Sequence, residues 1–281
     1  MRIKKGYRNG DLMAKKAQNY INEFNCLYRI IDNDNEHKSK LDPIDRNCRY
    51  QNIVTYKGNK VNLRLQSNYI NASWIHMPRY NYFIATQGPM PHTIESFWAM
   101  CYEQNVSLII MLCNLKENNV EKCSKYWNIR VPQSYDIIQL SEKEENGICT
   151  RLLEVYNNKL QTKFRVTQVQ LLCWDDHTAL NVNYYNQIIS LIKLVDKNSK
   201  PVVVHCSAGV GRTGTFICMY NLYQEIVKQI YVEKSNEIIF SIFNLVRKMK
   251  EMRMLSIENV NQFSLLYDFV NFLLINYNIR K

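Results

Sequence analysis

The 281-residue chain has little glycine and proline, eight and six residues respectively, and its nine cysteines form no CxxC pair. So little glycine and proline excludes a collagen-like or low-complexity protein. Nine cysteines scattered along the chain fit neither a disulfide framework nor a zinc ribbon, so we expect a reducing, cytoplasmic setting. The longest apolar runs are too short to span a bilayer, and no apolar stretch follows the basic N-terminus as it would in a signal peptide.

Acidic residues are outnumbered by basic ones, 25 to 36, which gives a formal net charge of +11. This surplus favours an anionic partner, but its sign alone does not distinguish nucleic acid, a membrane surface or a phosphopeptide. There is no internal repeat and no linker that would divide the chain. We therefore expect a flexible basic N-terminus at residues 1–16, followed by one domain over residues 17–281.

The pattern of apolar residues predicts an α/β fold with a mixed central sheet flanked by helices. Helical spacing occurs over residues 17–31, 182–195, 213–228, 237–253 and 259–274. Strand-like patterns occur over residues 67–75, 83–88, 107–113, 163–174 and 201–205. Thr93 is placed to cap a further helix, and the polar stretch at residues 32–47 predicts a loop.

One segment, VHCSAGVGRTG at residues 204–214, combines a buried strand, a glycine-rich turn and a helix start. Its glycines let successive backbone N–H groups turn inward, and the helix adds the positive end of its dipole. Arg212 can offer a planar pair of donors to phosphate oxygens. The segment therefore predicts an anion-binding loop, whose backbone is that of Ser207, Ala208, Gly209, Val210 and Gly211.

Cys206 lies at the base of this loop, five residues before Arg212. Dipoles that bind an oxyanion also favour a thiolate, and a thiolate in a phosphate-binding loop is a nucleophile aimed at phosphorus. Two simpler interpretations are a buried cysteine beside a glycine turn and a nucleotide-binding loop. The second lacks the GxxxxGK[ST] pattern that it requires.

The segment resembles the signature loop of the protein tyrosine phosphatases, the cysteine-dependent family with a C-x5-R motif. Further matching motifs are NYINASWI at 68–75, FIATQGPMPHTIESFW at 83–98, EKCSKYW at 121–127 and Gln262 near the C-terminus. The resemblance covers roughly residues 20–275. It implies one tyrosine-protein phosphatase domain with a mixed sheet, and a cysteinyl-phosphate intermediate formed without metal or cofactor.

The resemblance also implies roles for individual residues. Cys206 would be the nucleophile, Arg212 the phosphate ligand, and Asp176 the general acid that protonates the tyrosyl oxygen. His205 would hold the loop and tune the cysteine, and Thr213 would stabilise the departing thiolate. In the segment around EKCSKYW, Glu117 would pair with the arginine, and Lys122 would approach the general acid or the phosphate; both could equally be solvated loop charges.

Substrate recognition is implied for residues outside the signature loop. Tyr50 would stack on the substrate ring, and Asn52 stands where the family usually has an aspartate that holds the substrate backbone. Asparagine keeps the hydrogen bonding and loses the charge. Gln262 matches the second of two family glutamines, and Glu258 stands in place of the first, which orients the hydrolytic water.

Two departures therefore fall within the implied machinery. Asp175 replaces the usual proline before Asp176, which removes a fixed φ and adds a like charge beside the acid. Glu258 places a carboxylate near the phosphate, where repulsion is roughly 3 kcal/mol for unit charges ~6 Å apart at an effective dielectric near 20. The sequence leaves open whether turnover survives these changes.

The resemblance predicts a phosphoric monoester hydrolase that acts on phosphotyrosine proteins, with no nucleic-acid or membrane partner. A binding-class alternative is a phosphotyrosine trap that holds its ligand and turns over poorly. A third is a C-x5-R enzyme for RNA 5′ phosphates or phosphoinositides, which the positive charge favours and Tyr50 disfavours. The abundance of Asn, Ile, Lys and Tyr and the altered loops resemble the phosphatases that bracoviruses deliver into insect hosts, which implies host cytoplasm and host phosphoproteins.

Overall fold

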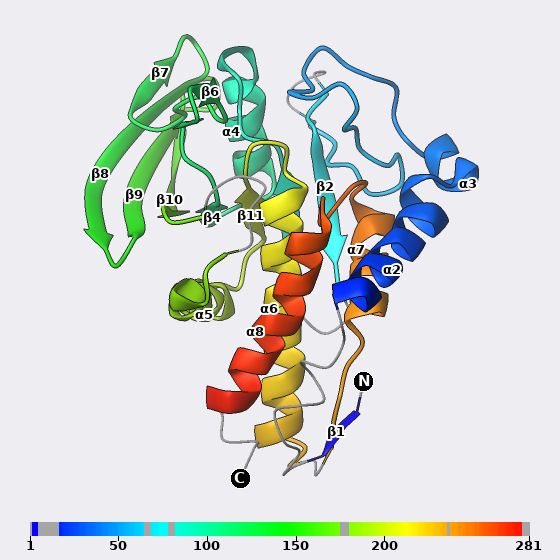
Figure 1. The fold of residues 1–281 in the computed structure, drawn as a ribbon. Coiled ribbons are helices and arrows are strands. Elements are labelled where there is room, and N and C mark those ends of the chain that lie inside the picture. Colours follow the sequence, from blue (N-terminus) through cyan, green and yellow to red (C-terminus); the bar gives the residue numbers. More distant parts are fainter. Residues whose placement is uncertain are drawn as a thin grey trace.

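A mixed sheet of eight strands forms the centre of the computed structural model, which describes residues 2–4, 17–64, 69–77, 82–174, 180–234 and 237–276 (Figure 1). Its strand order is β2-β3-β11-β4-β10-β9-β8-β7. The strands are β2 (Ala72–His76), β3 (Tyr82–Thr86), β4 (Leu108–Met111), β7 (Ile129–Val131), β8 (Tyr135–Glu145), β9 (Ile148–Asn157), β10 (Thr162–Leu171) and β11 (Val202–His205). Two small sheets pair β1 (Arg2–Lys4) with β12 (Glu237–Ile239), and β5 (Lys116–Glu117) with β6 (Val120–Glu121).

The four central strands β3, β11, β4 and β10 are parallel, and the outer pairs are antiparallel. Every residue of β4 and of β11 is buried, as expected for strands covered on both faces. Because parallel strands end at the same edge of a sheet, the loops that follow these four strands meet at one edge. In open α/β sheets that edge is where ligands bind.

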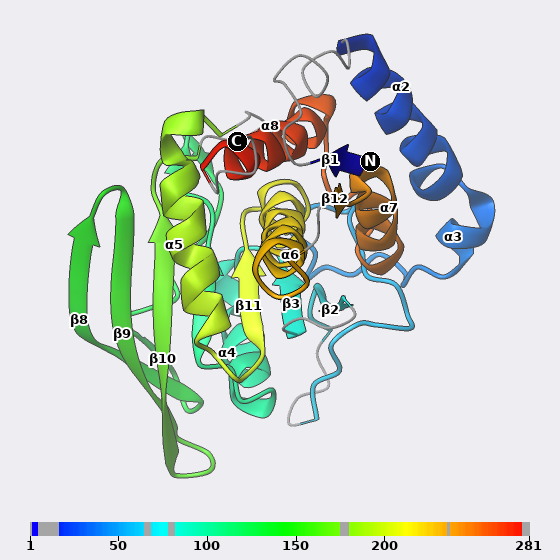
Figure 2. The ribbon, with the colours of Figure 1, turned by 90° about the horizontal axis from the view of Figure 1, so that it is seen from below.

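Helices cover both faces of the sheet. They are α2 (Ala17–Leu27) with the π-helical turn η1 (Tyr28–Asp32), α3 (Asn35–Ser39), η2 (Pro91–Thr93) with α4 (Ile94–Glu103), η3 (Val182–Tyr184) with α5 (Tyr185–Asp196), α6 (Gly211–Tyr231), α7 (Ile242–Met252) and α8 (Val260–Asn276). Helix α4 lies on one face, and α5, α6 and α8 lie on the other (Figures 1 and 2). The predicted α/β class, with a mixed central sheet flanked by helices, is confirmed.

Helix α6 is the most buried of these elements, because 15 of its 21 residues are buried. It packs against α8 along much of its length and runs directly from the loop after β11 (Figure 1). Its N-terminus therefore points at the edge where the parallel strands end. Within the described part of the chain, no helix is long and apolar enough to cross a membrane.

Three local predictions need correction. The stretch at 32–47 contains the short helix α3, because the Asp34 carboxylate accepts a hydrogen bond from the His37 N–H at 2.9 Å. The strand expected at 67–75 begins only at Ala72, since the Asn71 amide donates to the Ile53 carbonyl at 2.6 Å and ties this backbone to another loop; residues 67 and 68 lie outside the described part. The helix expected from residue 237 is preceded by β12 and starts after Ser241, whose hydroxyl accepts from Asn244.

Thr93 occupies the predicted position before α4 but does not cap it through its side chain. Its hydroxyl instead accepts a hydrogen bond from the Met90 N–H at 2.9 Å. The predicted helix at 17–31 is confirmed as α2 with its π-helical turn. At the N-terminus Arg2–Lys4 pairs with β12, whereas 5–16 lie outside the described residues, so flexibility there stays a prediction.

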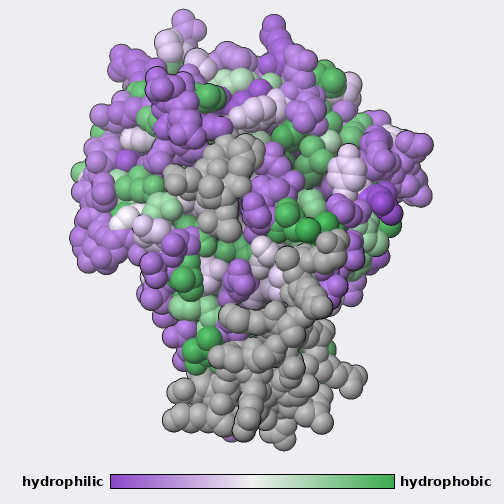
Figure 3. Space-filling model, viewed as in Figure 1, coloured by the Kyte–Doolittle hydropathy of each residue, from purple (hydrophilic) through white to green (hydrophobic). Residues whose placement is uncertain are grey.

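Hydrophilic side chains cover most of the upper half of the face shown in Figure 3, and hydrophobic areas on that face are small and separate. The larger apolar side chains are instead gathered in one core cluster that includes strands β4 and β11 and helix α6. The sheet edge that carries the converging loops is therefore held by a single rigid core.

Candidate active site

The loops that follow the four parallel strands bring together residues that are far apart in the sequence. Strand β11 leads into Cys206, β3 into Gly88, β4 into the hairpin with Glu117, and β10 into Trp174. The loops are joined by hydrogen bonds, such as Gly88 N–H to the Ser207 carbonyl at 2.9 Å. The signature segment therefore lies among the loops that converge at this edge of the sheet.

Cys206 is buried, with an exposed fraction of 4%, and its Sγ accepts a hydrogen bond from the Gly209 N–H at 3.3 Å. Gly209 has a φ of +71°, and a Cβ there would lie 2.2 Å from the Thr86 carbonyl oxygen. Only glycine fits this position, because both the backbone conformation and the space exclude a side chain. The glycine turns the loop so that backbone N–H groups can face the sulfur.

Arg253 holds the outer side of the loop, and sequence reasoning missed it. Its guanidinium is fully buried and donates to the carbonyls of Gly209 and Ala208, both at 3.2 Å, and to the Ser73 hydroxyl at 3.3 Å. Burial lowers the pKa of Arg253 to about 10, which leaves it charged at neutral pH. With the carbonyls fixed outward by this cation, the N–H groups of the same peptides point inward.

Arg212 lies in the first turn of α6 and pairs with Glu117, as predicted. Its two terminal nitrogens donate to the two carboxylate oxygens at 2.8 and 3.1 Å, and one of them also donates to the Trp174 carbonyl at 2.8 Å. Burial alone would lower the pKa of Arg212, but its hydrogen bonds to Glu117 and nearby negative groups raise it. The guanidinium is thus charged and fixed in orientation, as a bidentate phosphate ligand requires.

His205 is fully buried behind Cys206. Its Nδ1 lies 3.1 Å from the Cys206 carbonyl oxygen, and its Nε2 lies 2.8 Å from the Tyr126 hydroxyl. The histidine thus contacts the loop as the sequence predicted. The tyrosine belongs to the EKCSKYW motif, but its contact with the histidine was not anticipated.

The segment that carries Tyr50 is anchored to the same loops. Arg49 donates to the carbonyls of Gly88 and Pro89, at 3.1 and 2.8 Å. The Tyr50 hydroxyl lies 3.0 Å from the Ser207 hydroxyl, so its ring stands at the side of the signature loop. The ring is half-buried, as a wall for an aromatic ligand should be.

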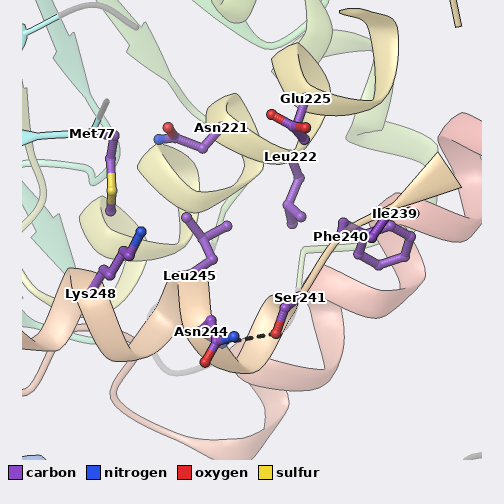
Figure 4. A pocket seen from close by; sticks show the side chains of 10 residues that line it. All are labelled: Met77, Asn221, Leu222, Glu225, Ile239, Phe240, Ser241, Asn244, Leu245 and Lys248. Atoms are coloured by element: carbon purple, nitrogen blue, oxygen red, sulfur yellow. Dashed lines mark hydrogen bonds between the residues drawn. The ribbon is translucent and has the colours of Figure 1, made fainter. Parts of the chain in front are cut away.

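A cleft of about 110 Å³ opens directly onto Cys206. It is lined by Tyr50, Asn52, Ile53, Cys206, Ser207, Ala208, Gly211, Arg212 and Glu258. A larger cavity of about 390 Å³ lies between α6 and α7 (Figure 4). Its lining includes the apolar Leu222 and Leu245 and contains no cysteine or histidine. The smaller cleft is therefore the one equipped for nucleophilic chemistry.

Glu258 and Gln262 both lie beside the first residue of α6. A Cβ at Gly211 would lie 3.1 Å from the Glu258 Oε2 and 2.9 Å from the Gln262 Nε2. The Gln262 Oε1 accepts a hydrogen bond from the Glu258 N–H at 2.9 Å. Asn259 precedes α8 and caps it, because its Oδ1 accepts from the Gln262 N–H at 3.0 Å. Glu258 is exposed and lines the cleft, whereas Gln262 is buried beneath it.

Of the remaining predicted residues, the structure describes Thr213 and Lys122 but not the two adjacent aspartates. Thr213 is fully buried, and among the described residues its Oγ1 has no hydrogen-bond partner, which leaves it available to a sulfur or phosphate. Lys122 is half-buried, and its N–H donates to the Leu115 carbonyl at 2.9 Å. Asp175 and Asp176 lie outside the described residues, directly after the buried Trp174 that Arg212 contacts.

A model of the family described as protein-tyrosine phosphatase matches residues 45–272. Tyrosine-protein phosphatase non-receptor type 20 of Rattus norvegicus is 32% identical over 272 residues, which cover 92% of this chain and 62% of that protein. Tyrosine-protein phosphatase 69D of Drosophila melanogaster is 31% identical over 269 residues, which cover 88% of this chain and 18% of that protein. The structure of PTPN18 in complex with HER2-pY1196 phosphopeptides is similar with a TM-score of 0.82 at 25% identity, over 94% of this chain and 95% of that one.

The chain therefore belongs to the protein-tyrosine phosphatase family. It spans about 62% of the length of the rat relative.

Proposed function

We propose that this member of the protein-tyrosine phosphatase family hydrolyses phosphotyrosine in proteins through a cysteinyl-phosphate intermediate. The observation that carries the proposal is the position of Cys206. Its sulfur accepts a hydrogen bond from the Gly209 N–H. Cys206 and Arg212 line the same cleft, and Glu117 fixes the orientation of the Arg212 guanidinium. A nucleophile and a bidentate phosphate ligand thus face the same small volume.

In the first step the Cys206 sulfur attacks phosphorus and the bond to the tyrosyl oxygen breaks. Asp176 gives its proton to that oxygen, and the signature-loop amides and Arg212 bind the equatorial phosphate oxygens. In the second step water attacks phosphorus, gives its proton to the Asp176 carboxylate, and the sulfur leaves as a thiolate. The Thr213 hydroxyl, unpartnered among the described residues, donates to that departing sulfur.

Substrate choice follows from the walls of the cleft. The Tyr50 ring, fixed beside Ser207, supplies an apolar face for the phosphotyrosine ring, while Asn52 lines the mouth. A phosphoserine side chain is too short to contact the Tyr50 ring while its phosphate reaches Cys206. This disfavours phosphoserine, and the narrow cleft likewise disfavours the larger ends of RNA or inositol lipids.

The test is incubation with a phosphotyrosine peptide, followed by phosphate measurement and mass spectrometry of the protein. We expect phosphate release and a phosphorylated Cys206, both absent in Cys206→Ser, which should still bind the peptide. Cys26→Ser is the matched control, because Cys26 is exposed on α2 and does not line the cleft. Residual activity of Cys206→Ser above about a tenth of the parent would place the nucleophile elsewhere.

A second candidate function is a phosphotyrosine trap that binds and releases slowly. Glu258 favours it, because this carboxylate lines the cleft where a phosphocysteine would form. Asp175, in place of proline, adds a charge beside the general acid. Phosphopeptide binding without steady phosphate release from a generic aryl phosphate would select the trap over the enzyme.

The resemblance to bracovirus phosphatases extends the proposal to the source of the substrates, namely phosphotyrosine proteins in the cytoplasm of insect cells. An Asp176→Ala variant that binds without cleaving should retain tyrosine-phosphorylated proteins from insect-cell extracts. Pretreating the extract with an unrelated tyrosine phosphatase should abolish that retention. Equal retention after the pretreatment would contradict this assignment.

A further inference from the structure

A continuous line of hydrogen bonds runs from the β8–β9 hairpin to the nucleophile. The Arg151 Nη1 donates to the Gln168 Oε1 at 3.0 Å, and the Gln168 Nε2 donates to the Tyr126 hydroxyl at 2.8 Å. That hydroxyl lies 2.8 Å from the His205 Nε2, and the His205 Nδ1 lies 3.1 Å from the Cys206 carbonyl oxygen. All five residues are buried, so water does not compete for these groups.

The two ends of this line fix the directions of the hydrogen bonds next to them. The Cys206 carbonyl can only accept, so the facing His205 Nδ1 must carry a proton. The Arg151 guanidinium can only donate, so Gln168 must present its oxygen to the arginine and its NH₂ group to the tyrosine. A flipped Gln168 amide would place two donors against each other.

Tyr126 transmits this orientation to the histidine. Its oxygen accepts from Gln168, and its proton faces His205 Nε2; the alternative acceptor, the Met111 sulfur, is weak and lies at 3.9 Å. Burial raises the pKa of Tyr126 well above its usual value, so the hydroxyl keeps its proton. The His205 Nε2 is therefore the acceptor in this hydrogen bond.

We propose that Arg151, acting through Gln168 and Tyr126, is a positioning residue that keeps His205 in the neutral Nδ1–H tautomer. The histidine then holds the Cys206 carbonyl without placing a positive charge beside the sulfur. An imidazolium there would stabilise the thiolate and make it a weaker nucleophile. The tautomer itself does not depend on the proposed function, whereas its effect on catalysis rests on that function.

The arginine is itself held from three sides. Its Nε donates to the Glu142 carboxylate at 2.5 Å, its Nη1 also donates to the Gln170 Oε1 at 3.0 Å, and its guanidinium lies 4.5 Å from the centre of the Trp127 ring. Bonds to carboxylate and stacking on an indole are the contacts that best fix a guanidinium. Arg151 is thus a rigid donor rather than a mobile surface charge.

Two variants alter the arginine end of the line in different ways. Arg151→Met removes the donor that orients Gln168. Gln168→Glu keeps the side-chain shape and the contact with Arg151, but its second oxygen can only accept from Tyr126, which reverses the tyrosine O–H and makes the His205 Nε2 donate. Arg165→Met is the matched control, because the Arg165 side chain is 64% exposed on the same sheet and bonds Glu154.

The direct readout is ¹⁵N NMR of the imidazole nitrogens of the full chain. It has five histidines, and the His205 signals are assigned by their loss in His205→Asn. We expect Nδ1–H in the parent and in Arg165→Met, an added Nε2–H form in Arg151→Met, and predominant Nε2 protonation in Gln168→Glu. An Nε2–H tautomer in the parent would overturn the proposal, and so would unchanged signals in both Arg151→Met and Gln168→Glu.

Kinetics with an aryl phosphate separate positioning from general loss of structure. We expect kcat to fall about tenfold in both Arg151→Met and Gln168→Glu, with KM within about twofold of the parent. In a Tyr126→Phe background, Arg151→Met should lower kcat no further. Arg151→Lys should restore part of the loss. If Arg151→Met does not fold, the isosteric Gln168→Glu decides. An inactive parent with the expected tautomers would reject the proposed function and leave the positioning role intact.

Discussion

The Arg253 guanidinium lies against the outside of the signature loop, where its Nε donates to the Gly209 carbonyl at 3.2 Å. A fully buried cation therefore sits behind the loop whose inner face we propose to bind the phosphate. Its charge adds to the positive potential of the α6 N-terminus, and its hydrogen bonds fix the peptide orientations. The anion site is consequently built from two layers, an inner layer of amides and Arg212 and an outer layer made by Arg253.

Removing the outer layer should affect both stability and activity. In Arg253→Met the carbonyls of Gly209 and Ala208 lose their buried donor, so we expect the free energy of unfolding to fall by about 3 kcal/mol. Urea unfolding measures this change. We also expect KM for aryl phosphate to rise, because the amides are no longer held inward. Arg253→Lys should recover part of the stability, and an Arg253→Met protein as stable as the parent would refute the two-layer account.

The general acid predicted from the sequence, Asp176, lies outside the described residues, so this role rests on the family motif after Trp174. Asp176→Ala should slow cleavage of a phenyl phosphate by about 100-fold or more, because the leaving oxygen loses its proton donor. A substrate with a good leaving group needs no proton and should be affected far less. Asp175→Ala, which removes the adjacent carboxylate, is the matched control. A larger loss from Asp175→Ala would mean that the acid is the other of the two adjacent carboxylates.

Tyr50 should confer the preference for aromatic phosphate esters. In Tyr50→Ala we expect KM for a phosphotyrosine peptide to rise about tenfold, because roughly 1.4 kcal/mol of ring contact is lost, while a short alkyl phosphate is little affected. Tyr50→Phe keeps the ring and loses only the hydroxyl contact with Ser207, so its effect should be smaller. Equal rates of the parent on phosphotyrosine and phosphoserine peptides would contradict the role given to the Tyr50 ring.

Much of the candidate site could be predicted because its cysteine, loop and arginine are contiguous in the sequence. Turn, strand and helix signals for VHCSAGVGRTG all fall within eleven residues, and each local preference agrees with the final structure. The partners of this loop were harder to find. Arg253 lies 44 residues after the Gly209 carbonyl that it contacts, and Gln168 lies 42 residues after Tyr126. No local pattern marks such pairs, since tertiary packing alone brings them together.

The β8–β9 hairpin was not predicted either, but here the sequence does carry a local signal. Glu145 pairs with Ile148 across a two-residue turn, Asn146–Gly147, in which both residues have positive φ, +52° and +74°. An Asn-Gly pair between strand-like segments is the strongest short-range indication of a hairpin. The polar and charged residues of β8 obscured it, because this strand is exposed along most of its length and shows no apolar alternation there.

Glu258 should make the second chemical step rate-limiting. The carboxylate lines the cleft with Cys206 and Arg212, beside the helix start where phosphate would be bound. It repels the phosphate and cannot donate the amide hydrogen bond that a glutamine would give to the hydrolytic water. Formation of phosphocysteine depends on other groups, namely Cys206, Arg212 and Asp176. We therefore expect a fast first step and a slow second one.

The consequence is a burst of about one leaving group per enzyme before a slower steady state, measured by stopped-flow absorbance with an aryl phosphate. Glu258→Gln should raise the steady rate without enlarging the burst, because it restores a neutral donor and leaves the first step unchanged. Glu251→Gln is a suitable control, since Glu251 is an exposed carboxylate on α7 that does not line the cleft. Linear release from the first turnover, with a Glu258→Gln variant no faster than the parent, would show that this carboxylate does not limit hydrolysis.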